Sequence, residues 1–262
     1  MTKDVPKISV IIPSYNQVEF IEETILSILN QEYTSLELII MDGGSTDKSV
    51  EVIKKYEDRI AHWVSESDNG QTHAINKGFR VATGDLVCWM NSDDIFLPEA
   101  FKQISEAYLK TSGSYEVYFG DKSNIDKAGN TIKTYFYPPF CGWGIKYTTN
   151  MNISNQACFW KPSLFEKVGY LDESIQFAMD YEWFLRIYLH GAKFKKINGV
   201  LGALRMYDEN KSSLEEWIKI KFENLHTIKE NNYIGYSPIK KALFYAYKAF
   251  FVGPRIIRSI FK

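Results

Sequence analysis

Hydrophobic positions in the first hundred residues alternate between short continuous runs and a helical spacing. Residues 8–12 and 36–41 form mainly apolar runs, which are typical of strands buried on both faces of a sheet. Five apolar residues between these runs recur every three or four positions and predict a helix with one buried side: Val18, Ile21, Ile25, Ile28 and Leu29.

The same alternation continues to residue 90. Apolar spacing predicts helices over 50–56 and 74–82, and short apolar runs predict strands over 61–65 and 86–90. This order favours an α/β fold with right-handed crossovers and a parallel sheet. Ligands bind outside the carboxyl ends of the strands in such sheets. We therefore expect the site in the loops that begin at four residues: Pro13, Asp42, Ser65 and Asn91.

The second half of the chain has a less regular pattern. Its expected elements are strands over 116–120 and 131–136 around a turn at 126–130, helices over 162–168 and 180–190, and a long helix over 214–230. Three tryptophans in this half, Trp143, Trp160 and Trp183, are candidates for stacking on a ligand, although burial in the core is the commoner role for such residues.

Composition indicates an ordinary globular protein, since 45% of the 262 residues are hydrophobic and 15% are aromatic. The net charge of -1 argues against a dedicated nucleic-acid binder. Three cysteines without a CxxC pair predict neither a disulfide framework nor a zinc site, and they favour a reducing, cytoplasmic compartment. The amino-terminal residues lack the apolar region of a signal peptide, and no run of 18 apolar residues predicts a membrane-spanning helix.

Acidic residues follow three successive predicted strands: Asp42, then Glu66 and Asp68, then Asp93 and Asp94. Carboxylates that converge on one cleft repel each other unless a cation or a proton compensates them. Oxygen ligands of this kind suit Mg²⁺ or Mn²⁺ shared with substrate phosphates. A helix cap before Pro98 is the alternative role for the last pair. Dinucleotide, P-loop, zinc-protease and nucleophile-elbow motifs are all absent from the sequence.

Four segments in a fixed order resemble family 2 glycosyltransferases of the GT-A fold: ISVIIPSYN at 8–16, MDGGSTD at 41–47, SESDNGQ at 65–71 with AINKG at 74–78, and TGD at 83–85 before NSDD at 91–94. The resemblance continues more weakly through 155–157, 165–169 and 177–182 and fades beyond about residue 213. It implies a Rossmann-like, mostly parallel sheet flanked by helices. It also implies a metal-assisted, inverting transfer of a sugar from a nucleotide diphosphate, with a UDP-sugar favoured, to an acceptor hydroxyl.

The resemblance also implies roles for individual residues. Pro13, Tyr15 and Asp42 would hold the base, and Asp68 and Lys77 would line the nucleotide side of the cleft. Asp93 would bind ribose or metal, and Asp94 would be the direct ligand of Mn²⁺ or Mg²⁺. Asp180 would be the general base, with Glu182 as the fallback. Arg205 and Lys211 would contact the diphosphate, while Tyr207 stands where many relatives carry a histidine.

On this basis residues 1–213 form a catalytic domain, with a nucleotide-binding half over about 1–98 and an acceptor-side half over about 99–213. Two other functions stay open at this point. A sugar nucleotidyltransferase would also need acidic metal ligands, but the segment after the first strand lacks its usual Gly-rich basic loop. A non-catalytic nucleotide- or carbohydrate-binding subunit would have no need of the four carboxylates Asp42, Asp93, Asp94 and Asp180.

The C-terminal segment, 214–262, is expected to be helical, basic and amphipathic. From residue 231 onward it carries six Lys or Arg residues and no Asp or Glu, so the remainder of the chain has 25 basic and 32 acidic residues. Pro254 is expected to begin a second short helix. Such a segment predicts docking on the anionic inner face of the cell membrane, where a saccharide or lipid-linked acceptor would be found. Packing on the catalytic domain or on a partner is the alternative.

Overall fold

The computed structural model describes residues 5–148, 152–175, 177–208 and 237–260. Its first half alternates strands and helices as expected. The elements are β1 (Ile8–Ser14), α1 (Ile21–Leu29), β2 (Leu36–Asp42), α2 (Ser49–Lys54), β3 (His62–Ser65), α3 (Gln71–Val81) and β4 (Leu86–Trp89). The four strands lie in the order β3-β2-β1-β4 and every pair is parallel. The predicted parallel sheet is therefore confirmed for this half.

The second half extends the same sheet with mixed strand directions. Its elements are β5 (Ile95–Phe96), α4 (Ala100–Lys110), β6 (Val117–Ile125), β7 (Thr131–Tyr135), α5 (Gly142–Thr148), β8 (Cys158–Trp160), α6 (Ser163–Val168), α7 (Met179–Leu189) and β9 (Phe194–Arg205). The order continues as β4-β8-β6-β9-β5, with β7 paired to β6. β8 runs antiparallel to both neighbours, whereas β6 and β9 are parallel. The α/β class is confirmed, and parallel pairing dominates only in the first half.

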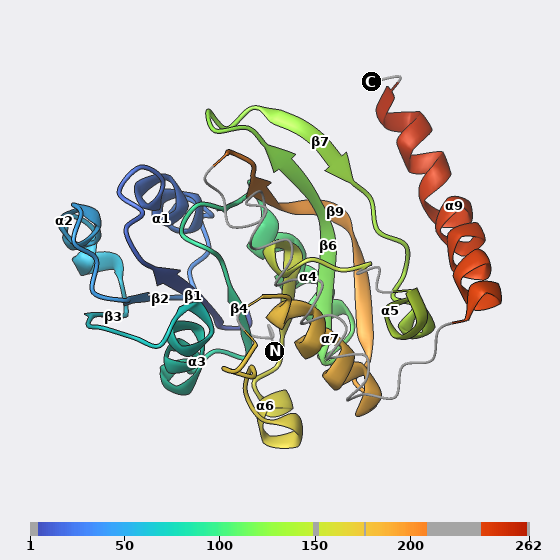
Figure 1. Ribbon diagram of the computed structural model, residues 1–262, viewed down its shortest axis with the longest axis horizontal. Coiled ribbons are helices and arrows are strands. Elements are labelled where there is room, and N and C mark those ends of the chain that lie inside the picture. The colour runs from blue at the N-terminus through green and yellow to red at the C-terminus, as the bar shows by residue number, and fades with distance from the viewer. Residues whose placement is uncertain (1–4, 149–151, 176, 209–236, 261–262) are drawn as a thin grey trace.

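Helices cover both faces of the curled sheet (Figure 1). Ile11 of β1 belongs to one core cluster, which includes side chains of α3, α6 and α7. Val10 and Ile12 point to the other face and pack in a second cluster with side chains of α1, α2 and α4. This alternation follows from the two-residue period of a strand. It explains why β1 carries apolar residues on both of its faces.

Two of the three candidate tryptophans are core residues. Trp160 and Trp183 are fully buried, and Trp160 packs edge-on against Trp89 with ring centroids 5.4 Å apart. Trp143 is half-buried and contacts Phe244 near the C-terminus. The common core role therefore applies to Trp160 and Trp183.

The described part of the C-terminal segment is one helix, α9 (Pro238–Ile260), which lies beside α5 at the edge of the molecule (Figure 1). The expectation that Pro254 begins a second helix is wrong, because Pro254 lies inside α9. Proline removes one backbone donor, and a long helix tolerates this loss at the cost of local stability. The helix predicted over 214–230 lies outside the described residues. Within the described ranges, none of the helices is long and apolar enough to cross a membrane.

Candidate active site

The acidic turn between β4 and β5 holds its two aspartates in different surroundings. Asp94 is completely buried, and its carboxylate accepts three hydrogen bonds of 2.9 Å. The donors are the Asn91 and Gln156 side-chain amides and the Arg205 backbone N–H. Asp93 is half-buried, and its Oδ2 accepts a hydrogen bond of 3.0 Å from the Tyr207 hydroxyl. Asp93 is therefore the more accessible carboxylate of the pair.

Burial raises the pKa of both Asp93 and Asp94. The neighbouring charge of Asp93 raises the pKa of Asp94 further, while the hydrogen bonds from Gln156 and Arg205 act in the opposite direction. Two adjacent carboxylates in a poorly solvated turn favour binding of a cation, because a cation relieves both the desolvation and the repulsion.

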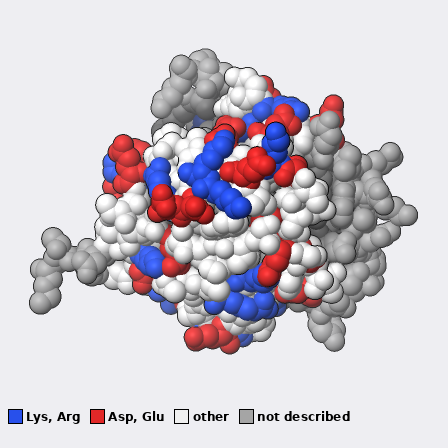
Figure 2. Space-filling model, turned by 90° about the vertical axis from the view of Figure 1, so that its left-hand side faces the viewer, with Lys and Arg blue, Asp and Glu red and all other residues white. Residues whose placement is uncertain are grey.

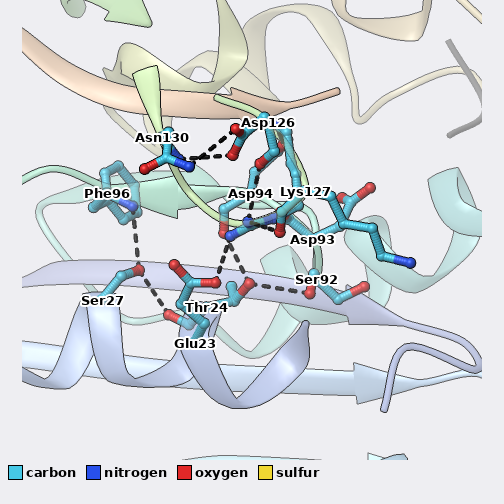
Figure 3. Close-up of polar contacts among 11 residues, drawn as sticks. Glu23, Thr24, Ser27, Ser92, Asp93, Asp94, Phe96, Asp126, Lys127 and Asn130 are labelled. Atoms are coloured by element: carbon cyan, nitrogen blue, oxygen red, sulfur yellow. Dashed lines mark hydrogen bonds and ion pairs between the residues drawn. The ribbon is translucent and has the colours of Figure 1, made fainter. Parts of the chain in front are cut away.

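Arg205 connects the acidic turn to three other segments. Its guanidinium is buried and donates to the Asp93 carbonyl at 2.9 Å and to the Lys127 carbonyl at 2.8 Å. It also forms an ion pair of 2.5 Å with Glu23 of α1. The same neighbourhood contains Thr24, whose hydroxyl lies 3.0 Å from the Ser92 carbonyl (Figure 3). The acidic turn is thus held by contacts with α1 and β9, and through Arg205 it is connected to the β6–β7 turn.

These contacts bear on the expected role of Arg205. The donors of its guanidinium are directed to carbonyl oxygens and to the half-exposed carboxylate of Glu23. In this conformation the side chain supports the acidic turn, and contact with a diphosphate stays a prediction. Lys211, the other cation expected there, lies outside the described residues.

Asp42 ends β2 and organises the turn that follows. Its carboxylate accepts hydrogen bonds from the Gly44 N–H at 3.1 Å, the Ser45 N–H at 2.9 Å and the Ser65 hydroxyl at 2.7 Å. The Ser45 hydroxyl adds a fourth at 2.5 Å. A carboxylate has about four lone-pair sites, so the turn and Ser65 of β3 together satisfy this one. The expected contact with a base stays a prediction.

The loop after β3 lies against the Asp42 turn. A Cβ atom added at Gly43 would be 2.6 Å from Asp68 Oδ2, so glycine permits this close approach. Lys77 of α3 pairs with Glu66 of the same loop. Tyr15, just beyond β1, is exposed, and Pro13 is buried within β1. The carboxyl ends of β1, β2 and β3 therefore bring these predicted residues to one edge of the sheet.

The first turn of α3 joins the acidic turn to the segment that carries Asp180. Gln71 donates to Asn91 at 2.8 Å, and Asn91 in turn donates to Asp94. The adjacent Thr72 hydroxyl lies 2.8 Å from the Met179 sulfur, one residue before Asp180. Two neighbouring residues of one helix turn thus link the two groups of candidate residues.

Asp180 lies in the first turn of α7, half-buried. The chain enters this helix through Ala178 in the left-handed conformation, with φ of 63°. A conformation of this kind costs an alanine about 1 kcal/mol and often occurs at functional sites. Glu182, the fallback base, is buried and bonds Arg186 through both carboxylate oxygens, at 2.6 and 2.8 Å. Of these two carboxylates, Asp180 is the more exposed.

Sequence reasoning did not single out several polar residues of the site. Gln156 falls in a segment of weak resemblance, and Glu23 reads as a solvent-facing helix residue. Their roles depend on contacts with residues far away in the chain, at Asp94 and Arg205. Over the described ranges, no cluster of three or more His, Cys, Asp or Glu side chains has the geometry of a protein-only metal site.

The sequence of the chain is similar to those of known glycosyltransferases. The model of the Glycosyl transferase family 2 matches residues 9–169. Chondroitin synthase of Escherichia coli is 28% identical over 246 residues, covering 90% of this chain and 35% of that protein. An uncharacterized glycosyltransferase of Mycobacterium tuberculosis is 31% identical over 187 residues, covering 69% of this chain and 68% of that protein. The chain thus spans about a third of the length of the chondroitin synthase.

Solved structures share the fold. The Staphylococcus aureus protein TarS, residues 1–349 in complex with UDP, has a TM-score of 0.67 at 18% identity, covering 94% of this chain and 70% of that one. A mannosyltransferase of Pyrobaculum calidifontis in complex with GDP-Man and Mn²⁺ gives the same TM-score, identity and coverage. The fold is the GT-A fold of glycosyltransferases. With three-fifths of its length matched by the family model, the chain belongs to glycosyl transferase family 2.

Proposed function

We propose that the protein is an inverting glycosyltransferase that moves a sugar from a nucleotide diphosphate, with UDP favoured, to an acceptor hydroxyl of a cell-surface polysaccharide or glycolipid. The main support is the acidic turn, in which a more accessible Asp93 lies next to a buried Asp94 that accepts three hydrogen bonds, at the carboxyl ends of parallel strands. The UDP and GDP-Man carried by the two structural relatives are consistent with a nucleotide-sugar donor.

Asp93 is the residue that we propose as the protein ligand of Mn²⁺ or Mg²⁺, in place of Asp94. Both carboxylate oxygens of the buried Asp94 accept hydrogen bonds from protein N–H groups. If this carboxylate turned to bind a metal instead, these buried donors would be left without a partner. Asp93 is partly exposed, and the hydroxyl that bonds its carboxylate is neutral and mobile about one torsion. When bound, the metal would neutralise charge on the departing diphosphate.

Asp180 is the proposed general base. Inversion requires one in-line attack, so a single carboxylate on the acceptor side is sufficient. Asp180 would accept the proton of the acceptor hydroxyl. The acceptor oxygen would then form the new bond to the anomeric carbon as the bond between that carbon and the diphosphate oxygen breaks. The link through Thr72 and Gln71 supports a fixed relation between this carboxylate and the acidic turn.

Nucleotide recognition is assigned to the edge formed by β1, β2 and β3. The exposed ring of Tyr15 is suited to stacking on a base, and Pro13 shapes the strand end beneath it. Asp42 would act mainly by holding its turn, whose Gly44 and Ser45 N–H groups donate to its carboxylate. Asp68 and Lys77 would complete the nucleotide side. We further propose that the enzyme works in the cytoplasm at the inner face of the cell membrane, on a saccharide or lipid-linked acceptor.

Calorimetry tests the donor and the metal together. The full chain should bind UDP more tightly with Mn²⁺ than with EDTA, and more tightly than it binds GDP. A chain that binds neither nucleotide with either Mn²⁺ or Mg²⁺ would refute the proposal. Binding of UDP without any effect of metal would refute only the role of Asp93.

A further inference from the structure

Strands β6 and β7 form a hairpin that carries two lysines and a tyrosine on one face. Lys122 of β6 pairs with Tyr135 of β7, and Lys133 lies two residues before Tyr135. Side chains that are opposite each other in an antiparallel pair, or two residues apart in one strand, point to the same face of a sheet. The ammonium groups of Lys122 and Lys133 lie 5.7 and 5.1 Å from the centroid of the Tyr135 ring. We call these three residues the basic-aromatic face.

The basic-aromatic face lies next to the acidic turn. Lys122 is also the partner of Gly202 in β9, and a Cβ atom added at Gly202 would be 2.0 Å from the Gln156 carbonyl oxygen. Gln156 in turn donates to Asp94. Burial and the Asp93 charge raise the pKa of Asp94, and the positive charge of Lys122 is among the effects that lower it. Register and electrostatics thus agree that Lys122 is on the side of the sheet that carries the candidate site.

The same face leads toward the proposed base. Tyr135 packs against the core cluster that includes Met179 and Tyr181, the two neighbours of Asp180 in α7. Tyr137, two residues after Tyr135, is buried in this cluster. Burial raises the pKa of Tyr137, and the charge of Asp180 is among the nearby effects that raise it further. A molecule in contact with the basic-aromatic face is therefore on the acceptor side of the site.

Charge indicates the chemistry of that molecule. Around α1, α2 and β3, basic and acidic side chains lie next to each other at the surface (Figure 2). The hairpin is different, because residues 122–135 include three lysines and one aspartate. One of these lysines, Lys127, pairs with an acidic residue near α1 at 2.8 Å. The other two, Lys122 and Lys133, place their charges over an aromatic ring, and this arrangement favours an anionic ligand with an apolar side.

We propose that the basic-aromatic face binds the acceptor through an anionic group, a carboxylate or a phosphate carried by the acceptor saccharide. The inference rests on the proposed function and specifies the chemistry of its acceptor. The two ammonium groups would donate charge-assisted hydrogen bonds to the anion, and the Tyr135 ring would pack against the apolar side of a sugar unit. The nucleotide is assigned to the edge of β1, β2 and β3, so the hairpin in the other half of the sheet is suited to the acceptor.

Calorimetry with defined probes tests this face in the full chain. The probes are an unsulfated chondroitin hexasaccharide, which carries carboxylates, its neutral carboxyl-reduced form, and an oligomer of glycerol phosphate. The wild type should bind at least one anionic probe about tenfold more tightly than the neutral one. Lys122→Gln and Lys133→Gln should each weaken that binding by about fivefold or more, because each removes a charged donor. Lys195→Gln is the matched control, since Lys195 also lies over a tyrosine ring, that of Tyr115 at 5.5 Å, and it should bind as wild type.

Failure of the wild type to prefer either anionic probe would overturn the proposal, and so would equal affinities of Lys122→Gln, Lys133→Gln and Lys195→Gln. The anionic probe that binds identifies the charged group as a carboxylate or a phosphate. UDP affinity with Mn²⁺ is measured on the same samples. A loss of UDP affinity in Lys122→Gln, with saccharide binding unchanged, would assign this lysine to the donor and also overturn the proposal. Absence of UDP binding in the wild type would count against the proposed function alone, because the saccharide measurement does not require the donor.

Discussion

Arg205 donates its backbone N–H to the Asp94 carboxylate at 2.9 Å, although the two residues are 111 positions apart in the chain. The same residue pairs with Glu23 and bonds the Asp93 carbonyl, so one buried side chain of β9 determines the shape of the acidic turn. A charge buried at this depth is tolerated because its donors are satisfied.

Replacing Arg205 with Lys should disturb the turn while retaining the charge. Lysine cannot reproduce the planar set of donors that reaches both Glu23 and the carbonyls. We expect a fall of about tenfold or more in apparent Mn²⁺ affinity, measured by titrating metal against transfer rate. Arg80→Lys, in the surface ion pair with Glu173, is the matched control and should behave as wild type. Equal metal affinity in Arg205→Lys and wild type would contradict a positioning role.

The two adjacent aspartates should give different phenotypes when changed to Asn. Asp93→Asn is expected to lose the enhancement of UDP binding by Mn²⁺ and to keep its melting temperature within a few degrees. Asp94→Asn should lower the melting temperature more, because an amide donor would face the N–H groups of Asn91, Gln156 and Arg205. Calorimetry and thermal unfolding distinguish them. The reverse pattern would restore Asp94 as the ligand.

Asp180→Asn should abolish transfer and spare donor binding. Loss of a general base lowers turnover by about 10² to 10⁴, while UDP affinity should stay within about twofold of wild type. Glu182→Gln provides the comparison. Because Glu182 bonds Arg186, Glu182→Gln should clearly lower the free energy of unfolding and change turnover only slightly. A drop in UDP affinity for Asp180→Asn would remove it from the base role.

Tyr207→Phe removes the hydroxyl that bonds Asp93 and keeps the ring against Phe20, where the centroids are 4.9 Å apart. Burial and the nearby Asp93 charge raise the pKa of Tyr207, so the hydroxyl stays protonated and acts as a donor. If this bond competes with the metal, the variant should bind Mn²⁺ more tightly than wild type, by about twofold to tenfold. Weaker metal binding would instead identify the hydroxyl as a contributor to the metal site.

The pH dependence of the free energy of unfolding should reflect Glu37, which lies near the amino end of β2, away from the candidate site. Burial by itself would raise the pKa of Glu37, but hydrogen bonds from Lys7, Ser9 and Thr83 lower it to about 2 from 4.5. Because the folded-state pKa is depressed, the stabilisation is complete above pH 4.5 and is lost as the pH falls towards 2. Glu37→Gln should cost about 2 kcal/mol at neutral pH, after allowance for screening, and progressively less in acid.

Urea unfolding at several pH values measures this difference. Glu51→Gln, on the exposed side of α2, is the control and should differ little from wild type at any pH. A constant difference between Glu37→Gln and wild type from pH 7 to pH 3 would show that the carboxylate charge is not responsible.

The parallel half of the fold is readable from the sequence because strands buried on both faces need nearly continuous apolar residues. β9 is not readable in this way. Its segment contains Lys196 and Gly202, which break the apolar pattern. Lys196 is accommodated by an ion pair of 2.8 Å with Asp121, and a side chain at 202 would collide with the Gln156 carbonyl. Both explanations depend on residues brought close only by folding.

The candidate site, too, could be predicted from the sequence only in part. The loops after β1, β2 and β4 follow from strand order, so Tyr15, Asp42 and Asp93 could be located in advance. The separate surroundings of Asp93 and Asp94 could not, since adjacent residues of one turn differ in burial only through partners such as Gln156 and Arg205. The buried environment of Arg205 likewise could not be predicted, because four segments that are far apart in the sequence form it.

The paired contacts of Gln71 and Thr72 have a consequence for motion during turnover. Consecutive residues of α3 contact the acidic turn and the segment before Asp180. These two parts of the site are therefore connected through one helix turn. Any movement of the acidic turn away from the segment before Asp180 would require either the loss of one of these 2.8 Å contacts or a displacement of α3 as a unit. A shift of the acidic turn and a shift of Asp180 would then occur together.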